Sequence, residues 1–292
     1  MKNIINHQPI VGVMRWGVWG SNFTTEQYEE IIYQCLSIGL NEFDHADIYG
    51  HYTTEAEFGK ALQNNSSLRT QIKIITKCGI QMLTPNRPAH QIKSYNTSAA
   101  HIKASVDQSL KNFHTDYIDT LLIHRPDVLM NPVEIAETIT QIKAAGKIKS
   151  FGVSNFTPSQ LSLINKHIKV DYHQVEISVT NLDAFTNGVL DQCQNNAIKA
   201  QAWSPWGNGL FTEKTEKHQR IIECAEALSK QYGTGVNEIL LAFLYTHPAK
   251  ITPVIGTTQF ARIKQAKEAM HIKLSTEDFY KLYSASVGAE VA

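Results

Sequence analysis

The sequence of 292 residues predicts a (β/α)8 barrel (TIM barrel), and two observations carry this prediction. Eight apolar, strand-like runs recur at fairly even spacing, and each is followed by at least one helical stretch. Several runs, such as Ile72–Ile75 and Ile118–Ile123, are rich in Ile and Leu with little alternation, which is typical of parallel strands covered by helices. A six-stranded doubly wound sheet is the alternative, but it would not account for all eight predicted strands.

The eight predicted strands define the order of the barrel. They lie near residues 10–16, 41–46, 72–77, 117–123, 150–154, 172–178, 198–203 and 251–255. The segments between them are long enough for helices, and no Gly/Ser-rich linker, low-complexity tract or charge block divides the chain. We therefore expect residues 1–292 to form a single domain.

Helix signals lie between these strands. A capping residue followed by a first-turn proline occurs at Asn131-Pro132 and again at Thr157-Pro158. Two helices, at 218–232 and 236–246, stand between the seventh and eighth strands, so one of them is an addition to the simple repeat. A last, carboxyl-terminal helix begins at Ser275.

Composition excludes several classes of partner. Lys plus Arg and Asp plus Glu number 27 each, so no basic surplus favours nucleic acid or an acidic membrane. The four cysteines are widely spaced, which argues against a disulfide framework or a thiolate zinc site. Residues 1–7 lack the apolar core of a secretory signal, and no stretch approaches the roughly 18 apolar residues of a membrane span. We expect a cytoplasmic protein; its oligomeric state stays open.

Four ionisable side chains follow neighbouring strands. Asp44, Lys77 and His124 stand at the carboxyl ends of the second, third and fourth strands, and Tyr49 lies just beyond the second. An ammonium next to a phenol should lower the phenol's pKa from about 10, and a buried carboxylate should keep the ammonium charged. The imidazole can orient a substrate oxygen. This set suits protonation of a carbonyl oxygen while something else delivers a hydride. Asp44 could instead cap a helix or pair with Arg69.

Two other readings of nearby residues stay open. His45, His51 and Asp47 are residue types that bind metals, but no HxH or HExxH spacing is present and Lys77 would repel a cation, so we predict no metal. Trp16 belongs either to the core or to the wall of a substrate pocket.

In their order along the chain, these motifs resemble those of the aldo-keto reductases over nearly the whole length. Asp44 and Tyr49 match the family's Asp-x-Ala-x-x-Tyr element, Lys77 its Thr-Lys element and His124 its Leu-x-x-His element. The resemblance implies a catalytic tetrad in which Tyr49 donates the proton, Lys77 and Asp44 tune it, and His124 orients the carbonyl.

The resemblance also implies a nicotinamide cofactor. It assigns Ser154, Asn155 and Gln174 to the nicotinamide carboxamide, Trp203 to stacking on the nicotinamide ring, Ser204, Trp206 and Gly207 to the loop along the pyrophosphate, and Thr257, Arg262 and Gln265 to the adenosine phosphate. Arg262 matches the family's 2′-phosphate arginine, which implies NADPH in preference to NADH. The chain departs from the family's pattern at Gly256, where many members have a basic residue, and at Ala266, where they have Asn.

These observations predict an NADPH-dependent oxidoreductase that reduces small aldehydes or ketones to alcohols. A nucleotide-sensing barrel with slow turnover, similar to the potassium-channel β subunits, is the first alternative, and a metal-dependent barrel hydrolase is the second. The substrate depends on loops such as 80–97 and 125–132 and cannot be derived from the sequence.

Overall fold

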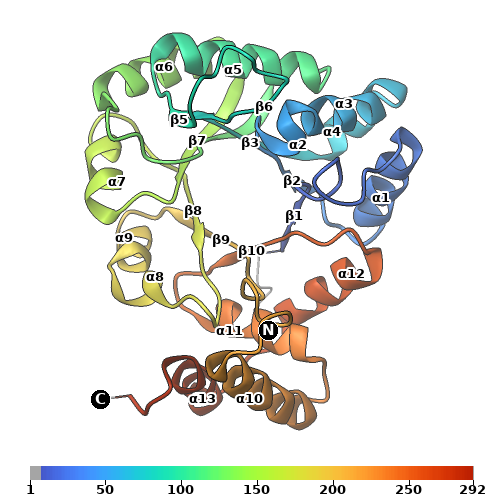
Figure 1. Ribbon diagram of the computed structural model, residues 1–292, viewed down its shortest axis with the longest axis vertical. Coiled ribbons are helices and arrows are strands. Elements are labelled where there is room, and N and C mark those ends of the chain that lie inside the picture. Colours follow the sequence, from blue (N-terminus) through green and yellow to red (C-terminus); the bar gives the residue numbers. More distant parts are fainter. Residues whose placement is uncertain (1–7, 292) are drawn as a thin grey trace, which may run out of the picture. The chain divides into compact units, whose positions relative to one another are not determined.

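The computed structural model describes residues 8–291 and contains a closed barrel of eight parallel strands with helices around it (Figure 1). The strands are β1 (Ile10–Gly12), β2 (Glu42–Asp44), β3 (Lys73–Cys78), β6 (Ile118–Ile123), β7 (Ile148–Ser154), β8 (Tyr172–Glu176), β9 (Lys199–Trp203) and β10 (Thr252–Ile255). They follow one another around the barrel as β1-β10-β9-β8-β7-β6-β3-β2. Each overlaps one predicted run, so the predicted fold is confirmed.

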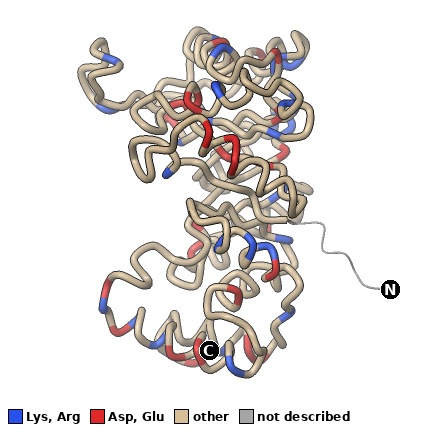
Figure 2. Tube along the Cα trace, turned by 90° about the vertical axis from the view of Figure 1, so that its right-hand side faces the viewer, with Lys and Arg blue, Asp and Glu red and all other residues tan. Residues whose placement is uncertain are grey.

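Contacts divide the chain into two compact units. The first unit holds residues 10–174 and 256–260, and the second holds residues 8–9, 175–255 and 261–291. Acidic and basic residues occur in both units (Figure 2). Within residues 8–291, none of the helices has the length and apolar character needed to cross a membrane. Residues 1–7, which carry the prediction about a secretory signal, lie outside the described part, and a single domain over 1–292 remains a prediction.

The first unit contains the helices that follow the first five strands. They are α1 (Thr25–Ser37), α2 (Tyr49–Tyr52), α3 (Thr54–Asn64), α4 (Leu68–Gln71), α5 (Ala99–Asn112), α6 (Pro132–Ala144) and α7 (Pro158–Asn165). The predicted starting signals act as expected. Asn131 accepts backbone hydrogen bonds from the first turn of α6, and Thr157 forms a capping box with Gln160 in α7. Two of the predicted helix starts are thereby confirmed.

The second unit contains α8 (Asp183–Thr186), α9 (Val189–Asn195), α10 (Glu216–Tyr232), α11 (Val236–Thr246), most of α12 (Phe260–Glu268), the 3-10 turn η1 (Ala269–His271) and α13 (Thr276–Val287). The helices α10 and α11 confirm the predicted pair between the seventh and eighth strands. Ser275 caps α13, and Gly288 ends it with a φ of 86°. Figure 1 shows α13 beside α10.

A small second sheet departs from the sequence prediction. The segment 80–97 was expected to be a loop, but it contains an antiparallel pair, β4 (Ile80–Gln81) and β5 (Ser94–Tyr95). Strands of two residues carry no periodic signal, which is why the pattern did not reveal them. The hydroxyl of Tyr52 donates to the Ile80 carbonyl at 3.1 Å and accepts from the Met82 amide at 3.0 Å. These two bonds attach the segment to α2.

Trp16 belongs to the core of the first unit. Its side chain is fully buried and packs against the rings of Phe23, Tyr28, Phe43 and Phe58 at centroid distances of 5.6–6.2 Å. Aromatic side chains bury large areas and prefer such tilted or edge-to-face arrangements. Of the two readings left open for Trp16, the core role is confirmed.

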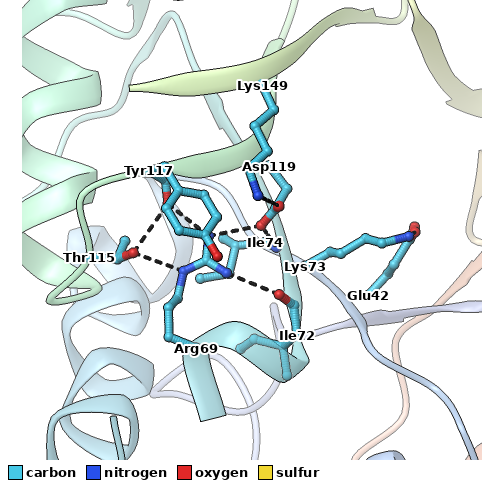
Figure 3. Close-up of polar contacts among 9 residues, drawn as sticks. All are labelled: Glu42, Arg69, Ile72, Lys73, Ile74, Thr115, Tyr117, Asp119 and Lys149. Atoms are coloured by element: carbon cyan, nitrogen blue, oxygen red, sulfur yellow. Dashed lines mark hydrogen bonds and ion pairs between the residues drawn. The ribbon is translucent and has the colours of Figure 1, made fainter. Parts of the chain in front are cut away.

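A polar cluster closes the amino-terminal ends of β3 and β6 (Figure 3). The Arg69 guanidinium donates to the Thr115 hydroxyl and to the carbonyls of Ile72 and Tyr117 at 2.8–3.0 Å. It also forms an ion pair with Asp119 at 2.8 Å. The alternative that Asp44 pairs with Arg69 is therefore wrong.

Candidate active site

The register of the parallel strands brings the predicted tetrad together at their carboxyl ends. Asp44 lies opposite Ile75 of β3, and Lys77 stands two residues further on the same face of that strand. The Lys77 ammonium donates to Asp44 Oδ2 at 2.6 Å, to the His45 carbonyl at 2.8 Å and to the Tyr49 hydroxyl at 3.2 Å. The side chains of Lys77 and Asp44 are only 1% and 4% exposed. Lys77 thus links a buried carboxylate to the phenol.

The direction of the Tyr49 pKa shift differs from the sequence prediction, whereas the charge on Lys77 agrees with it. Desolvation raises the pKa of the Tyr49 phenol, although the neighbouring Lys77 charge acts to lower it. The expected net lowering is therefore wrong, because burial outweighs the ammonium. Burial also opposes the charge on Lys77, but Asp44 and Tyr49 outweigh it and raise the pKa of the amine. Near neutral pH, the phenol keeps its proton and Lys77 is charged.

His124 completes the set from the end of β6. Its ring lies 6.1 Å from the Tyr49 ring, nearly perpendicular to it. Burial, then the charges of Lys77 and Arg125, holds the pKa of the imidazole well below its usual range. A neutral imidazole has one hydrogen-bond donor and one acceptor. His124 can therefore donate a hydrogen bond to a substrate oxygen without transferring its proton to that oxygen.

Arg125 is a neighbour of the site that the sequence did not single out. Its charge acts to lower the pKa values of both Tyr49 and His124, which places a second cation near the tetrad. Its position directly after the Leu-x-x-His element was visible, but no spacing rule indicates that its charge reaches the phenol.

The three residues predicted at the nicotinamide carboxamide also lie together in the first unit. The Asn155 side-chain amide donates to Ser154 Oγ at 2.7 Å, and the Asn155 backbone amide donates to the Gln174 carbonyl at 2.9 Å. The Gln174 side-chain amide donates to Asp44 Oδ1 at 2.9 Å, so this group is joined to the tetrad. Hydroxyl and amide groups are the natural hydrogen-bond complement of a carboxamide.

In the second unit, Trp203 ends β9 and a sharp turn follows it. Ser204 and Gly207 have positive φ values of 50° and 90°. A Cβ at Gly207 would come within 2.7 Å of the Thr180 side chain, so the turn requires glycine there. The Trp206 indole N–H donates to the Asn237 carbonyl at 3.2 Å, which anchors the turn to α11.

The residues predicted at the adenosine phosphate flank the start of α12. Thr257 accepts a hydrogen bond from the Gln259 amide at 3.2 Å and precedes the helix. Arg262 and Gln265 are exposed on α12, whereas Ala266 is buried on its inner face. The space around a Cβ at Gly256 is empty to 4 Å, so packing does not explain the missing basic side chain there.

The residues that we considered as metal ligands do not form a cluster of ligands. The His45 ring is fully buried between Phe58 and Phe113, at 4.5 and 4.8 Å. Burial raises the pKa of Asp47 well above its usual range. No group of three His, Cys, Asp or Glu side chains suited to a metal ion occurs within residues 8–291.

The backbone directly after Tyr49 is strained. Gly50, His51 and Tyr52 have consecutive positive φ values of 58°, 59° and 71°. For a residue with a Cβ, this left-handed region costs about 1–2 kcal/mol. The Asn86 side chain donates to the His51 carbonyl at 2.8 Å, and Tyr52 holds the segment 80–97. Such strain occurs preferentially at functional sites, and no sequence pattern predicted it here.

Comparison with known proteins identifies the family of this chain. The profile of the Aldo/keto reductase family matches residues 10–286. The oxidoreductase YcsN of Bacillus subtilis is 41% identical, over 97% of this chain and 95% of its own. A 6-dehydroglucose reductase of Agrobacterium fabrum is 38% identical, over 88% of this chain and 87% of its own. The crystal structure of the thermostable aldo-keto reductase Tm1743 superposes with a TM-score of 0.78 at 25% identity, covering 94% of each chain.

The closed parallel barrel and the match to this family profile define a class of nicotinamide-dependent oxidoreductases. The chain belongs to the aldo/keto reductase family. It is an NAD(P)H-dependent oxidoreductase that acts on small carbonyl compounds.

Proposed function

We propose that this protein reduces aldehydes or ketones to alcohols with NADPH, and that Tyr49 is the proton donor. The observation that carries the proposal is the position of the Lys77 ammonium, 2.6 Å from Asp44 and 3.2 Å from the Tyr49 hydroxyl. A phenol that keeps its proton at neutral pH is available as an acid. The adjacent ammonium stabilises the phenolate that remains after the proton has left.

The residues assigned to the cofactor fit a nicotinamide. Ser154, Asn155 and Gln174 form one connected hydrogen-bonding group that is joined to Asp44. They would hold the carboxamide, and the resemblance to the family assigns the stacking surface for the ring to Trp203. A reduced nicotinamide, when bound, supplies the hydride that side chains cannot.

The protein's own part in the reaction is to bind, orient and protonate the carbonyl oxygen. His124, held neutral, donates a hydrogen bond to that oxygen and fixes its direction. As negative charge develops on the oxygen, Tyr49 gives up its proton to form the alcohol, and Lys77 stabilises the phenolate with Asp44 behind it. The hydride on carbon and the proton on oxygen together account for the added hydrogen.

Arg262 supports the choice of NADPH. Its guanidinium is exposed on the first turn of α12 and is free to reach a 2′-phosphate, with Thr257 as a hydroxyl ligand nearby in the chain. Charge-assisted bonds of this kind favour the phosphorylated cofactor. Because Gly256 adds no second cation, we expect the preference over NADH to depend mainly on Arg262.

The relative named 6-dehydroglucose reductase suggests where to look for a substrate. A hexose that carries an additional carbonyl belongs in the first panel. The cytoplasm remains the proposed location, since the four cysteines are free thiols, three of them buried.

The test is consumption of NADPH and of NADH by purified protein across aldehydes, ketones and oxidised sugars, with the alcohol product identified. We expect many turnovers per protein molecule and a lower KM for NADPH. If bound NADPH is oxidised only once and steady-state turnover stays negligible, the protein is a nucleotide sensor and the proposal is wrong.

A further inference from the structure

The strained segment after Tyr49 carries an imidazole whose role the proposed reaction leaves unexplained. Tyr52 uses its hydroxyl to hold the segment 80–97, and the carbonyl of His51 accepts from Asn86. The His51 side chain is exposed, and within residues 8–291 its ring nitrogens have no hydrogen-bond partner. Glycine would adopt a φ of 59° without strain, yet position 51 carries a large polar ring.

The ring of His51 shares one aromatic neighbour, Trp19, with the Tyr49 phenol. It lies edge-on to Trp19 with centroids 5.3 Å apart, and Trp19 lies 6.1 Å from the Tyr49 ring. Tyr49 also packs, together with Trp19, Tyr52 and Met82, against the buried apolar residues Ala46, Ile48 and Ile80. His51, two residues after the proposed proton donor, therefore adds exposed hydrogen-bonding atoms at the edge of this largely apolar cluster.

We propose that His51 is a specificity-determining residue that selects carbonyl substrates bearing a hydroxyl group next to the carbonyl. A hydroxyl both donates and accepts, and the two ring nitrogens of an imidazole can match either role. An apolar wall alone would favour alkyl or aryl carbonyls. The inference rests on the proposed carbonyl reduction and adds a substrate class to it.

The experiment compares D-glyceraldehyde with propanal, which has the same carbon chain without hydroxyls, at saturating NADPH. We expect wild type to favour glyceraldehyde in kcat/KM. His51→Gly should lower kcat/KM for glyceraldehyde about 3- to 10-fold, the effect of one hydrogen bond, and leave propanal within about twofold. His51→Asn, which keeps a donor and an acceptor on a shorter side chain, should lower it by less. Asn and Gly both tolerate the left-handed backbone, so the fold is retained.

His114 provides the matched control. It is also an exposed histidine with a positive φ of 50°, but it follows α5 and precedes β6, at the end of the strands opposite Tyr49. His114→Asn and His114→Gly should change neither substrate.

Two outcomes overturn the inference. In the first, the glyceraldehyde-to-propanal ratio of kcat/KM stays at the wild-type value in both His51 variants; if both substrates fall together in this way, the strained segment only positions Tyr49. In the second, the His114 variants change the ratio as much as the His51 variants do. If wild type oxidises NADPH with no carbonyl compound at all, the proposed function is wrong. If wild type reduces carbonyl compounds but the His51 variants keep its selectivity, only this inference is wrong.

Discussion

Replacing Lys77 by methionine should destabilise the protein strongly and abolish carbonyl reduction. The ammonium and the Asp44 carboxylate are almost fully buried and 2.6 Å apart. Removing one partner of such a pair leaves an uncompensated buried charge, which costs about 3–5 kcal/mol in the free energy of unfolding. An exposed ion pair would cost only about 0–1 kcal/mol.

A second substitution should restore stability without restoring activity. In the double variant Asp44→Asn/Lys77→Met no charge remains, and the Gln174 amide can still donate to the oxygen at position 44. One amide donor is left without a partner, which costs about 1–3 kcal/mol. We therefore expect the double variant to be more stable than Lys77→Met alone. Both variants should be inactive, because the ammonium next to the Tyr49 phenol is missing in both.

Urea denaturation followed by tryptophan fluorescence, extrapolated linearly to water, measures the two free energies. Steady-state NADPH oxidation with a good carbonyl substrate measures the activity of the same preparations. The reasoning is refuted if the double variant is no more stable than Lys77→Met, or if either variant turns over as fast as wild type.

Three further predictions test other parts of the structure. Arg262→Ala should raise the KM for NADPH about 10- to 100-fold and leave the KM for NADH unchanged. Gln265→Ala, one turn away on the same exposed face, should have a smaller effect on the KM for NADPH. An equal change in the KM of both cofactors would contradict this. Arg69→Lys should lower the free energy of unfolding by about 2–4 kcal/mol, because the planar guanidinium makes four hydrogen bonds. The kcat should not change, because Arg69 lies at the end of the strands remote from Tyr49. A urea midpoint equal to that of wild type would contradict this prediction. Burial lowers the pKa of His173 to about 4, so only the unfolded state takes up this proton below about pH 6.5 and the stability that His173 contributes is lost as pH falls. Between pH 7 and pH 5, wild type should therefore lose about 2 kcal/mol more than His173→Gln, and parallel pH profiles of the urea midpoint would rule this out.

The barrel and the order of the tetrad were predictable because both leave a local pattern. Each strand is a contiguous apolar run, and each reactive residue stands at a fixed distance from the end of one. Parallel strands bring those ends together, so Asp44 and Lys77 meet although 33 positions separate them. The caps at Asn131 and Thr157 are likewise local interactions between neighbouring residues.

The features that were not predicted depend on contacts between distant segments. The direction of the Tyr49 pKa results from burial competing with Lys77, and burial is a property of the folded chain. The partner of Arg69 is Asp119, which the sequence could not distinguish from Asp44. The left-handed backbone at His51 is stabilised by Asn86, 35 residues away, and leaves no signature of its own.

The central claim is that Tyr49 protonates the carbonyl oxygen, and Tyr49→Phe tests it most directly. This variant removes the hydroxyl and keeps the ring that packs against Trp19 and His124. With NADPH affinity followed separately by fluorescence titration, the account predicts that kcat falls about 10²- to 10⁴-fold while the Kd for NADPH stays within about twofold. Undiminished carbonyl reduction by purified Tyr49→Phe would contradict it.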